Sequence, residues 1–146
     1  MKFSLWTDYG ALNSRPGFDA FATSLMDNGH TVVYNSNNSD IDVIWSVLFH
    51  GRMARNKAIW QNKKPTIVLE GGGIKRGPTW KVGLNGINRD GDNLPDSNDS
   101  TRASLQGLKL NTWRTNGTYI LICGQHDKSL QWQGMPSMSN WLIRTI

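Results

Sequence analysis

The stretch Ile41-Asp-Val-Ile-Trp-Ser-Val-Leu-Phe49 (IDVIWSVLF) decides the fold of this 146-residue chain. Over most of its length apolar side chains fall on both faces of an extended backbone, whereas a strand with one face in water would alternate strictly. Burial on both faces is typical of a central strand in a parallel sheet that is covered by helices. We therefore predict an inner strand here and interpret the neighbouring segments around it.

Strand and helix patterns alternate on either side of this stretch. In chain order we expect a strand at 2–7, a helix at 18–25 that closes at 28–29, a strand at 30–34, the central strand, a basic helix at about 52–61 and a strand at 65–70. Strands that alternate with helices of about ten residues indicate a parallel sheet with helical cover. The predicted fold class is α/β, a three-layer Rossmann-like domain with a mainly parallel sheet.

The residues that follow are rich in glycine. Residues 71–117 hold nine of the chain's 15 glycines. We expect residues 74–88 to be ordered, because they carry large apolar side chains that require burial, and residues 89–100 to form a surface excursion. The apolar side chains are those of Trp80, Val82, Leu84 and Ile87.

Order is expected to return near the C-terminus. The apolar run Tyr119–Cys123 predicts a short strand, and apolar residues at helical spacing predict a final helix from about Ser137. We predict that residues 1–115 form the Rossmann-like domain. Residues 116–146 then supply a strand and a helix that begin a second domain or pack back on the first.

The positive charges are concentrated in one segment. Residues 51–89 hold nine Lys and Arg side chains against the single Glu70, and the formal net charge of the chain is +5. A basic patch favours anionic partners such as nucleotide phosphates or nucleic acid, and a solvated basic surface is the alternative. A phosphorylated small molecule, nucleic acid and a second copy of the chain bound through the C-terminal helix are the partners to consider.

The sequence also bears on compartment and cofactors. The first ten residues are too polar for a signal peptide and no run reaches the length of a membrane span, so we expect a cytoplasmic protein without a membrane partner. Cys123, the only cysteine, is expected to be a buried thiol. His30, His50 and His126 lack the spacing of a metal site, and we expect neither metal nor cofactor.

Chemistry in a parallel sheet gathers at the carboxyl ends of its strands. Such ends are expected at residues 8–10, 50–52, 70–76 and 125–127. The candidate ligand-binding residues are therefore Tyr9, Gly10, Arg52, Gly71, Gly72, Gly73, Lys75, Arg76, Lys81, Gln125 and His126.

The glycine triplet Gly71–Gly73 matches no standard phosphate-binding loop. Gly72 and Gly77 have the P-loop separation, but Pro78 stands where the P-loop lysine belongs, and the dinucleotide fingerprint fails at Arg76. Consecutive glycines indicate positive φ angles or the close approach of a ligand to backbone N–H groups, and both interpretations stay open. We expect the triplet at the carboxyl edge of the parallel sheet, opening onto a hollow. A triplet on an antiparallel hairpin would argue against an enzymatic role.

Three side chains are candidates for catalysis. Glu70 ends a predicted strand among cations, where it could orient a hydroxyl, act as a base or form a structural ion pair. Asp8 and His50 follow strands at equivalent positions, and either could be a general base or a structural residue.

Tryptophan is frequent, with seven residues in the chain. We expect Trp45 and Trp60 in the core, and Trp80, Trp113 and Trp132 in loops, where an indole could stack on a base or a sugar.

The strings VIWSVLFHGRMARNKAIW, PTIVLEGGGIKRGPTWKVGLNGIN and YILICGQHDKSLQW resemble phage and environmental proteins similar to glycosyltransferases of the B fold. The resemblance covers about residues 40–146. It implies an acceptor-side Rossmann-like domain in residues 1–115 and the first strand and helix of a donor-side domain in residues 117–146.

This resemblance also implies a function. The intact parent would transfer a sugar from a nucleotide-sugar donor without a metal, and Asp8, His50 and Glu70 would be candidates for the acceptor-side base. The glycine triplet with Lys75 and Arg76 would line the interdomain cleft. Since most of the donor-side domain is missing, the chain alone is expected to be inactive. The alternative is a non-catalytic nucleotide- or nucleic-acid-binding α/β domain.

Overall fold

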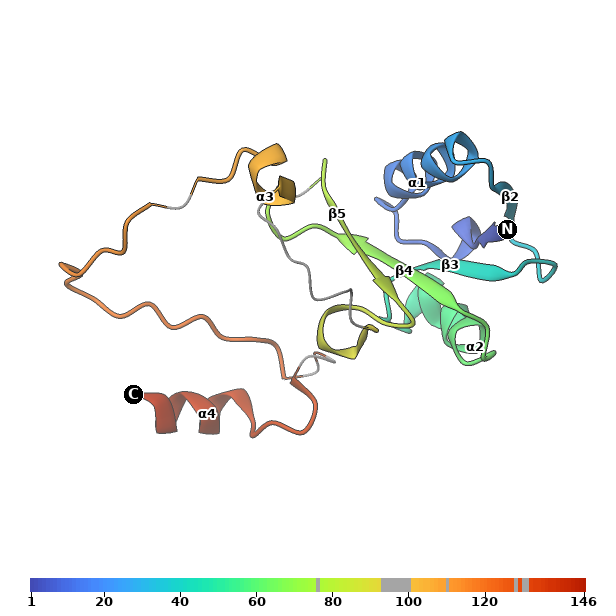
Figure 1. Cartoon of the computed structure of the whole chain (residues 1–146). Coiled ribbons are helices and arrows are strands. Elements are labelled where there is room, and N and C mark those ends of the chain that lie inside the picture. The colour runs from blue at the N-terminus through green and yellow to red at the C-terminus, as the bar shows by residue number, and fades with distance from the viewer. Residues whose placement is uncertain (76, 93–100, 110, 128, 130–131) are drawn as a thin grey trace. The chain divides into compact units, whose positions relative to one another are not determined.

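A five-stranded sheet organises the first part of the chain in a computed structural model (Figure 1). The structure describes residues 1–146 except 76, 93–100, 110, 128, 130 and 131. The chain divides into two compact units, a sheet unit, Met1–Asn93, and a C-terminal unit, Leu94–Ile146. The boundary between the units lies before the predicted position at 115, and the assignment of residues 116–146 to a second domain stays a prediction.

The sheet unit has the strand order β2-β1-β3-β4-β5. Its elements are β1 (Lys2–Leu5), η1 (Thr7–Tyr9), α1 (Arg15–Asp27), β2 (Thr31–Tyr34), β3 (Ile41–Trp45), η2 (Gly51–Arg55), α2 (Asn56–Trp60), β4 (Thr66–Gly71), β5 (Trp80–Leu84) and η3 (Asn88–Asp90). Strands β2, β1, β3 and β4 run parallel, and β5 pairs with β4 in the antiparallel direction. The predicted α/β class and mainly parallel sheet are thus confirmed.

Strand β3 is the inner strand that the sequence predicts. Its side chains alternate between the two faces of the sheet, so Val43 and Trp45 lie on one face while Asp42 and Ile44 lie on the other. All four are at most 5% exposed. Both faces therefore need cover, and α1 and α2 supply it on opposite sides of the sheet (Figure 1).

Helix α1 covers the face that carries Val43 and Trp45. It presents Phe18, Ala22 and Leu25 to a core built with side chains of β1, β3 and β4. The helix ends in a Schellman motif, in which the amide of His30 donates to Leu25 O over 3.0 Å. Gly29 has the positive φ of 75° that this motif requires.

The basic helix predicted at residues 52–61 consists of two short pieces. The 3-10 helix η2 leads into α2, a single α-helical turn. Buried Ile59 and Asn56 turn this segment toward the sheet face opposite α1.

Strand β5 was missed by the sequence analysis, which expected ordered chain there but no strand. As the edge of the sheet it leaves Val82 49% and Leu84 41% exposed, so the expected burial is wrong for these two residues. Trp80 is half-buried against the core, and Ile87 is buried as expected.

The C-terminal unit contains α3 (Thr101–Leu105) and α4 (Met138–Thr145). Helix α4 begins where predicted: Ser137 Oγ accepts from the amide of Asn140, and Asp127 Oδ1 accepts from that of Met138 over 2.6 Å. Most of the predicted excursion at 89–100 lies outside the described residues.

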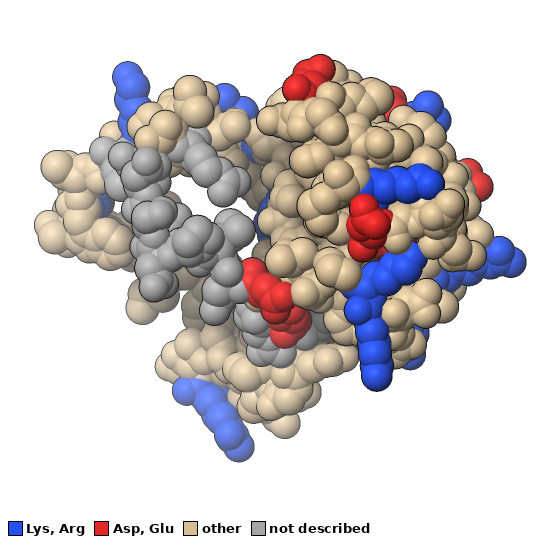
Figure 2. Space-filling model, turned by 45° about the vertical axis from the view of Figure 1, so that its right-hand side comes forward, with Lys and Arg blue, Asp and Glu red and all other residues tan. Residues whose placement is uncertain are grey.

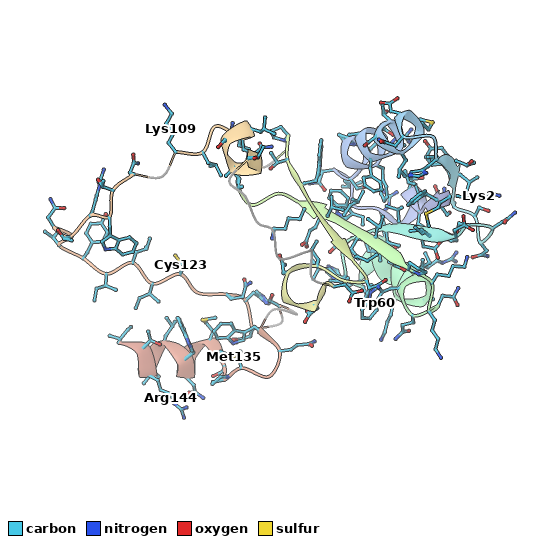
Figure 3. The ribbon with its side chains drawn as sticks, in the orientation of Figure 1. Lys2, Trp60, Lys109, Cys123, Met135 and Arg144 are labelled. Atoms are coloured by element: carbon cyan, nitrogen blue, oxygen red, sulfur yellow. The ribbon has the colours of Figure 1, made fainter. Side chains whose placement is uncertain are left out.

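Residues 119–123 do not form the predicted strand. Ile120 is 89% exposed and Leu121 is 77% exposed. A strand needs a neighbour for its backbone N–H and C=O groups, and none is paired with this segment in the part of the chain that is described. Cys123 is exposed rather than buried, on an extended stretch of backbone (Figure 3).

None of the helices in the described part of the chain has the length and apolar character that crossing a bilayer requires.

The close approach of α1 to the sheet at Gly17 generates a stability prediction. A Cβ added at Gly17 would lie 2.9 Å from Cζ3 of Trp45 and 3.1 Å from Cδ1 of Trp80. Gly17→Ala should therefore destabilise the sheet unit by about 1–3 kcal/mol, despite the better helix propensity of alanine. Urea unfolding followed by circular dichroism measures the change. The matched control is Ser24→Ala on the exposed face of α1, and equal stability of the two variants would contradict the packing argument.

Candidate functional site

The strand order places a topological switch point between β1 and β3. From β1 the chain passes to β2 on one side, and β3 then lies on the other side of β1. The loop after β1 leads to α1, whereas the loop after β3 leads to η2 and α2 on the opposite face. In open α/β sheets this divergence of loops at the carboxyl edge is the usual place for a ligand.

An aromatic ledge holds a guanidinium group at this edge. The rings of Trp6 and Tyr9 are stacked, with centroids 5.9 Å apart and an interplanar angle of 15°. The Arg55 guanidinium lies 5.5 Å from the centroid of Tyr9, and its Nη1 donates to Tyr9 Oη over 3.1 Å. Cation–π attraction and this hydrogen bond restrict an arginine that would otherwise sample many rotamers.

The ledge is anchored to the sheet through a buried carboxylate. Trp6 Nε1 donates to Asp42 Oδ1 over 3.0 Å, and Ser39 Oγ donates to the same oxygen over 3.0 Å. Trp6 is 7% exposed and Asp42 is 1% exposed, so the indole orientation is determined inside the sheet unit. The position of Arg55 thus follows from β3 through Trp6 and Tyr9.

Asn56 joins the two loops of the switch point. Its Nδ2 donates to Tyr9 O over 3.2 Å and to Trp45 O over 2.9 Å. The side chain is fully buried, and its Oδ1 has no hydrogen-bond partner among the described residues. A buried acceptor without a protein partner is uncommon, and it distinguishes Asn56 from the other buried polar residues of this edge.

Ser46 is the second unusual residue at this edge. It has a positive φ of 61° and is buried, a combination that costs free energy for a residue other than glycine. Its Oγ accepts from the amide of Leu48 over 3.1 Å and donates to Glu70 Oε1 over 3.4 Å. Glu70 is therefore held toward the loop that follows β3.

The predicted catalytic residues all lie at the carboxyl edge. Asp8 and His50 are exposed and Glu70 is half-buried. No hydrogen bond joins any two of these three side chains within the described residues. Lys81 stands opposite Glu70 in the β4–β5 pairing, but its Nζ donates to Asn88 Oδ1 over 3.1 Å.

The glycine triplet lies at the predicted edge, but it opens an antiparallel hairpin. Gly71 pairs with Trp80 in β5, and the amide of Gly72 donates to Thr79 O over 2.8 Å. None of the three glycines has a positive φ. A Cβ on Gly72 would lie 2.5 Å from Thr79 O, so the glycine is required by the hairpin itself. This finding counts against the enzymatic interpretation of the chain, which depends on a triplet that opens onto a hollow.

The remaining predicted ligand-binding residues fall into three groups. Tyr9 belongs to the ledge, and buried Gly10 leaves room for Ser14 and Phe18. Arg52 is exposed in η2, and Lys75 accepts through its backbone O from Thr79 Oγ1 over 2.7 Å in the hairpin turn. Arg76 lies outside the described residues, and Gln125 and His126 belong to the C-terminal unit, where the amide of His126 donates to Gln125 Oε1 over 3.3 Å.

The sequence analysis missed Trp6, Arg55 and Asn56. The predicted helix at about 52–61 includes Arg55 and Asn56 but assigns neither of them a role. The signal that could have found them is the adjacency of β1 and β3, because it brings the loops that follow these two strands together.

Metal ligands are not gathered at this edge. In the described ranges, no three His, Cys, Asp or Glu side chains lie close enough together to hold a metal ion. What the arrangement offers is a restrained guanidinium, with Arg52 and His50 on the same loop, and the carboxylates of Asp8 and Glu70. These groups can bind phosphate and accept hydrogen bonds from hydroxyls.

Comparison with protein-family models, with curated proteins and with solved structures finds no match to this chain, so the case for a function is made by the geometry of the switch point.

Proposed function

We propose that the sheet unit is a Rossmann-like, three-layer binding domain for a nucleotide, a nucleotide-sugar or another phosphorylated small molecule. The site is the carboxyl edge between β1 and β3. The observation that carries the proposal is the Arg55 guanidinium, held over Tyr9 where the strand order reverses.

The donors of Arg55 suit a phosphate group. A guanidinium has five N–H donors in a planar fork, and Tyr9 Oη takes one of the hydrogen bonds from Nη1. The outward donors remain for phosphate oxygens, for which arginine is better suited than lysine because it binds in a bidentate way. Exposed Arg52, on the same loop, adds a second positive charge.

The carboxylates of this edge restrict the orientation of the ligand. Asp8 and Glu70 would repel a phosphate, but they accept hydrogen bonds from sugar hydroxyls. A ligand with phosphate at Arg55 and hydroxyls at Glu70 satisfies both kinds of group. A nucleotide or nucleotide-sugar has this combination, which neutral sugars and inorganic phosphate lack.

Sugar transfer, as the resemblance to glycosyltransferases of the B fold implies, is the second proposal. It is supported by Glu70, whose Oε1 accepts from Ser46 Oγ over 3.4 Å at the carboxyl edge. Glu70 would be the acceptor-side base. We rank it second because the glycine triplet is explained by hairpin packing and because Asp8, His50 and Glu70 are not joined by hydrogen bonds in the described chain.

Removal of the restrained guanidinium tests the binding proposal. We expect isothermal titration calorimetry to detect binding of uridine diphosphate, and Arg55→Gln to weaken it about 10- to 100-fold, the value of charge-assisted hydrogen bonds to phosphate. Arg15→Gln removes the same charge from an exposed ion pair with Asp19 and should leave the affinity unchanged. Equal losses in both variants would show a non-specific charge effect and refute the site.

Turnover tests whether this chain itself transfers a sugar. With nucleotide-sugar donors and free sugars as acceptors, we expect the chain to release no nucleoside diphosphate, because the binding groups include no assembled catalytic pair. Coupled detection of released diphosphate measures this. Release that is lost in Glu70→Gln, while calorimetry shows unchanged binding, would contradict the ranking and favour a transferase.

A further inference from the structure

A hollow of about 330 Å³ lies at the opposite, amino-terminal edge of the sheet. It is lined by Trp60, Lys63, Lys64, Pro65 and Asn85. These residues come from the end of α2, the turn that leads into β4 and the turn that follows β5. The hollow therefore does not belong to the switch-point site, which lies at the carboxyl edge.

One wall of the hollow is a fixed indole. Trp60 Nε1 donates to Asn85 O over 2.7 Å, and the ring lies 5.4 Å from that of Phe49. Asn85 is itself held, because its amide donates to Thr66 O over 2.6 Å and its Oδ1 accepts from the amide of Thr66 over 2.9 Å. Trp60, which is labelled in Figure 3, is half-buried, so the expected place in the core is wrong. Its polar atom is occupied, so the ring offers apolar contact.

Two lysines line the hollow, and they are held in different ways. Lys64 Nζ donates to Asn37 O over 2.7 Å. Lys63 has a positive φ of 59°, a backbone conformation that costs a lysine free energy. Its exposed ammonium has no partner among the described residues. The strained turn thus keeps a charged side chain at the rim where glycine would be more stable.

One carboxylate, that of Asp92, belongs to the hydrogen-bond network that holds Asn85. Asp92 Oδ2 accepts from Asn85 Nδ2 over 2.6 Å. Lys63 and Lys64 are the charged side chains among the residues that line the hollow. Figure 2 shows Lys and Arg side chains spread over the face in view, with fewer Asp and Glu side chains among them.

We propose that the amino-edge hollow binds single-stranded nucleic acid, with a base against the Trp60 indole and phosphates at Lys63 and Lys64. An aromatic ring beside cations is the combination that single strands require, since every base has a π-face and every nucleotide a phosphate. A duplex hides the faces of its bases in the stack, so the indole gains nothing from it. This inference concerns another edge of the sheet and another ligand than the proposed function.

The test measures fluorescence anisotropy of a labelled 12-nucleotide oligothymidylate with the full chain, over a series of NaCl concentrations. Lys63→Gly removes the ammonium and relieves the positive φ, so this variant should fold at least as well as the parent. We expect the affinity to fall several-fold, and the slope of log affinity against log salt to become shallower by about 0.7, the value for one phosphate contact of a single strand.

The stacking partner is tested separately. Trp60→Leu should weaken binding about 5- to 100-fold, and Trp60→Phe should retain most of the affinity because it keeps an aromatic ring. Circular dichroism checks that both variants are folded. Equal losses in Leu and Phe variants, or equal affinity for a duplex competitor, would overturn the assignment of the indole.

Cross-variants separate this inference from the proposed function. Arg55→Gln should leave oligonucleotide affinity unchanged, and Lys63→Gly should leave uridine diphosphate affinity unchanged. Oligonucleotide binding that responds to Arg55→Gln but not to Lys63→Gly would overturn the inference, because the strand would then occupy the carboxyl edge. Oligonucleotide binding that responds to Lys63→Gly, in a chain that does not bind uridine diphosphate, would support the inference and refute the proposed function.

Discussion

Burial of β3 on both faces is the constraint on which the rest of the sheet unit depends. Residues 42–47 are all buried, and a strand in that environment needs neighbours on both edges and cover on both faces. Strands β1 and β4 supply the edges, and α1 and α2 the cover. Because the chain must visit both faces, the loops after β1 and β3 separate, and that separation creates the switch point. The buried Asp42 then requires donors, and Trp6 meets this need while supporting the aromatic ledge.

The two candidate sites are connected by the shorter of the two α-helices of the sheet unit. Helix α2 runs from Asn56, which joins the switch-point loops, to Trp60, which lines the amino-edge hollow. Between them Ile59 is buried against the sheet. One helical turn and its flanking residues therefore carry the guanidinium of one edge and the indole of the other. The cations around α2 therefore lie at two places, Arg55 at the carboxyl edge and Lys63 and Lys64 at the amino edge, rather than in one continuous patch.

The central strand and α1 could be predicted from the sequence because their apolar periodicity is strong and their caps are local. Strand β5 could not, although Trp80, Val82 and Leu84 do alternate, because the glycine-rich context indicates a loop. The run 119–123 shows the reverse case: its pattern favours a strand, but the structure gives it no paired neighbour among the described residues. In both cases tertiary pairing decided the outcome, and the sequence does not record which edges are free.

The candidate site shows the same division between local and non-local information. Asp8, Tyr9, His50 and Glu70 were placed at the carboxyl edge because they follow strands, which a sequence shows. The contact of Arg55 with Tyr9 depends on the order of the strands in the sheet. A single sequence does not show that order.

The glycine triplet illustrates why composition alone misleads about function. Gly72 is required because the backbone of Thr79 approaches it, and a hairpin imposes that approach whether or not a ligand is present. The glycines therefore carry no independent evidence for phosphate binding. Arg55 is different, since its exposed guanidinium lies over an aromatic ring outside the buried core. A residue whose placement exceeds what folding demands is the better indicator of a binding site, and for this reason the proposed function depends on Arg55 rather than on the triplet.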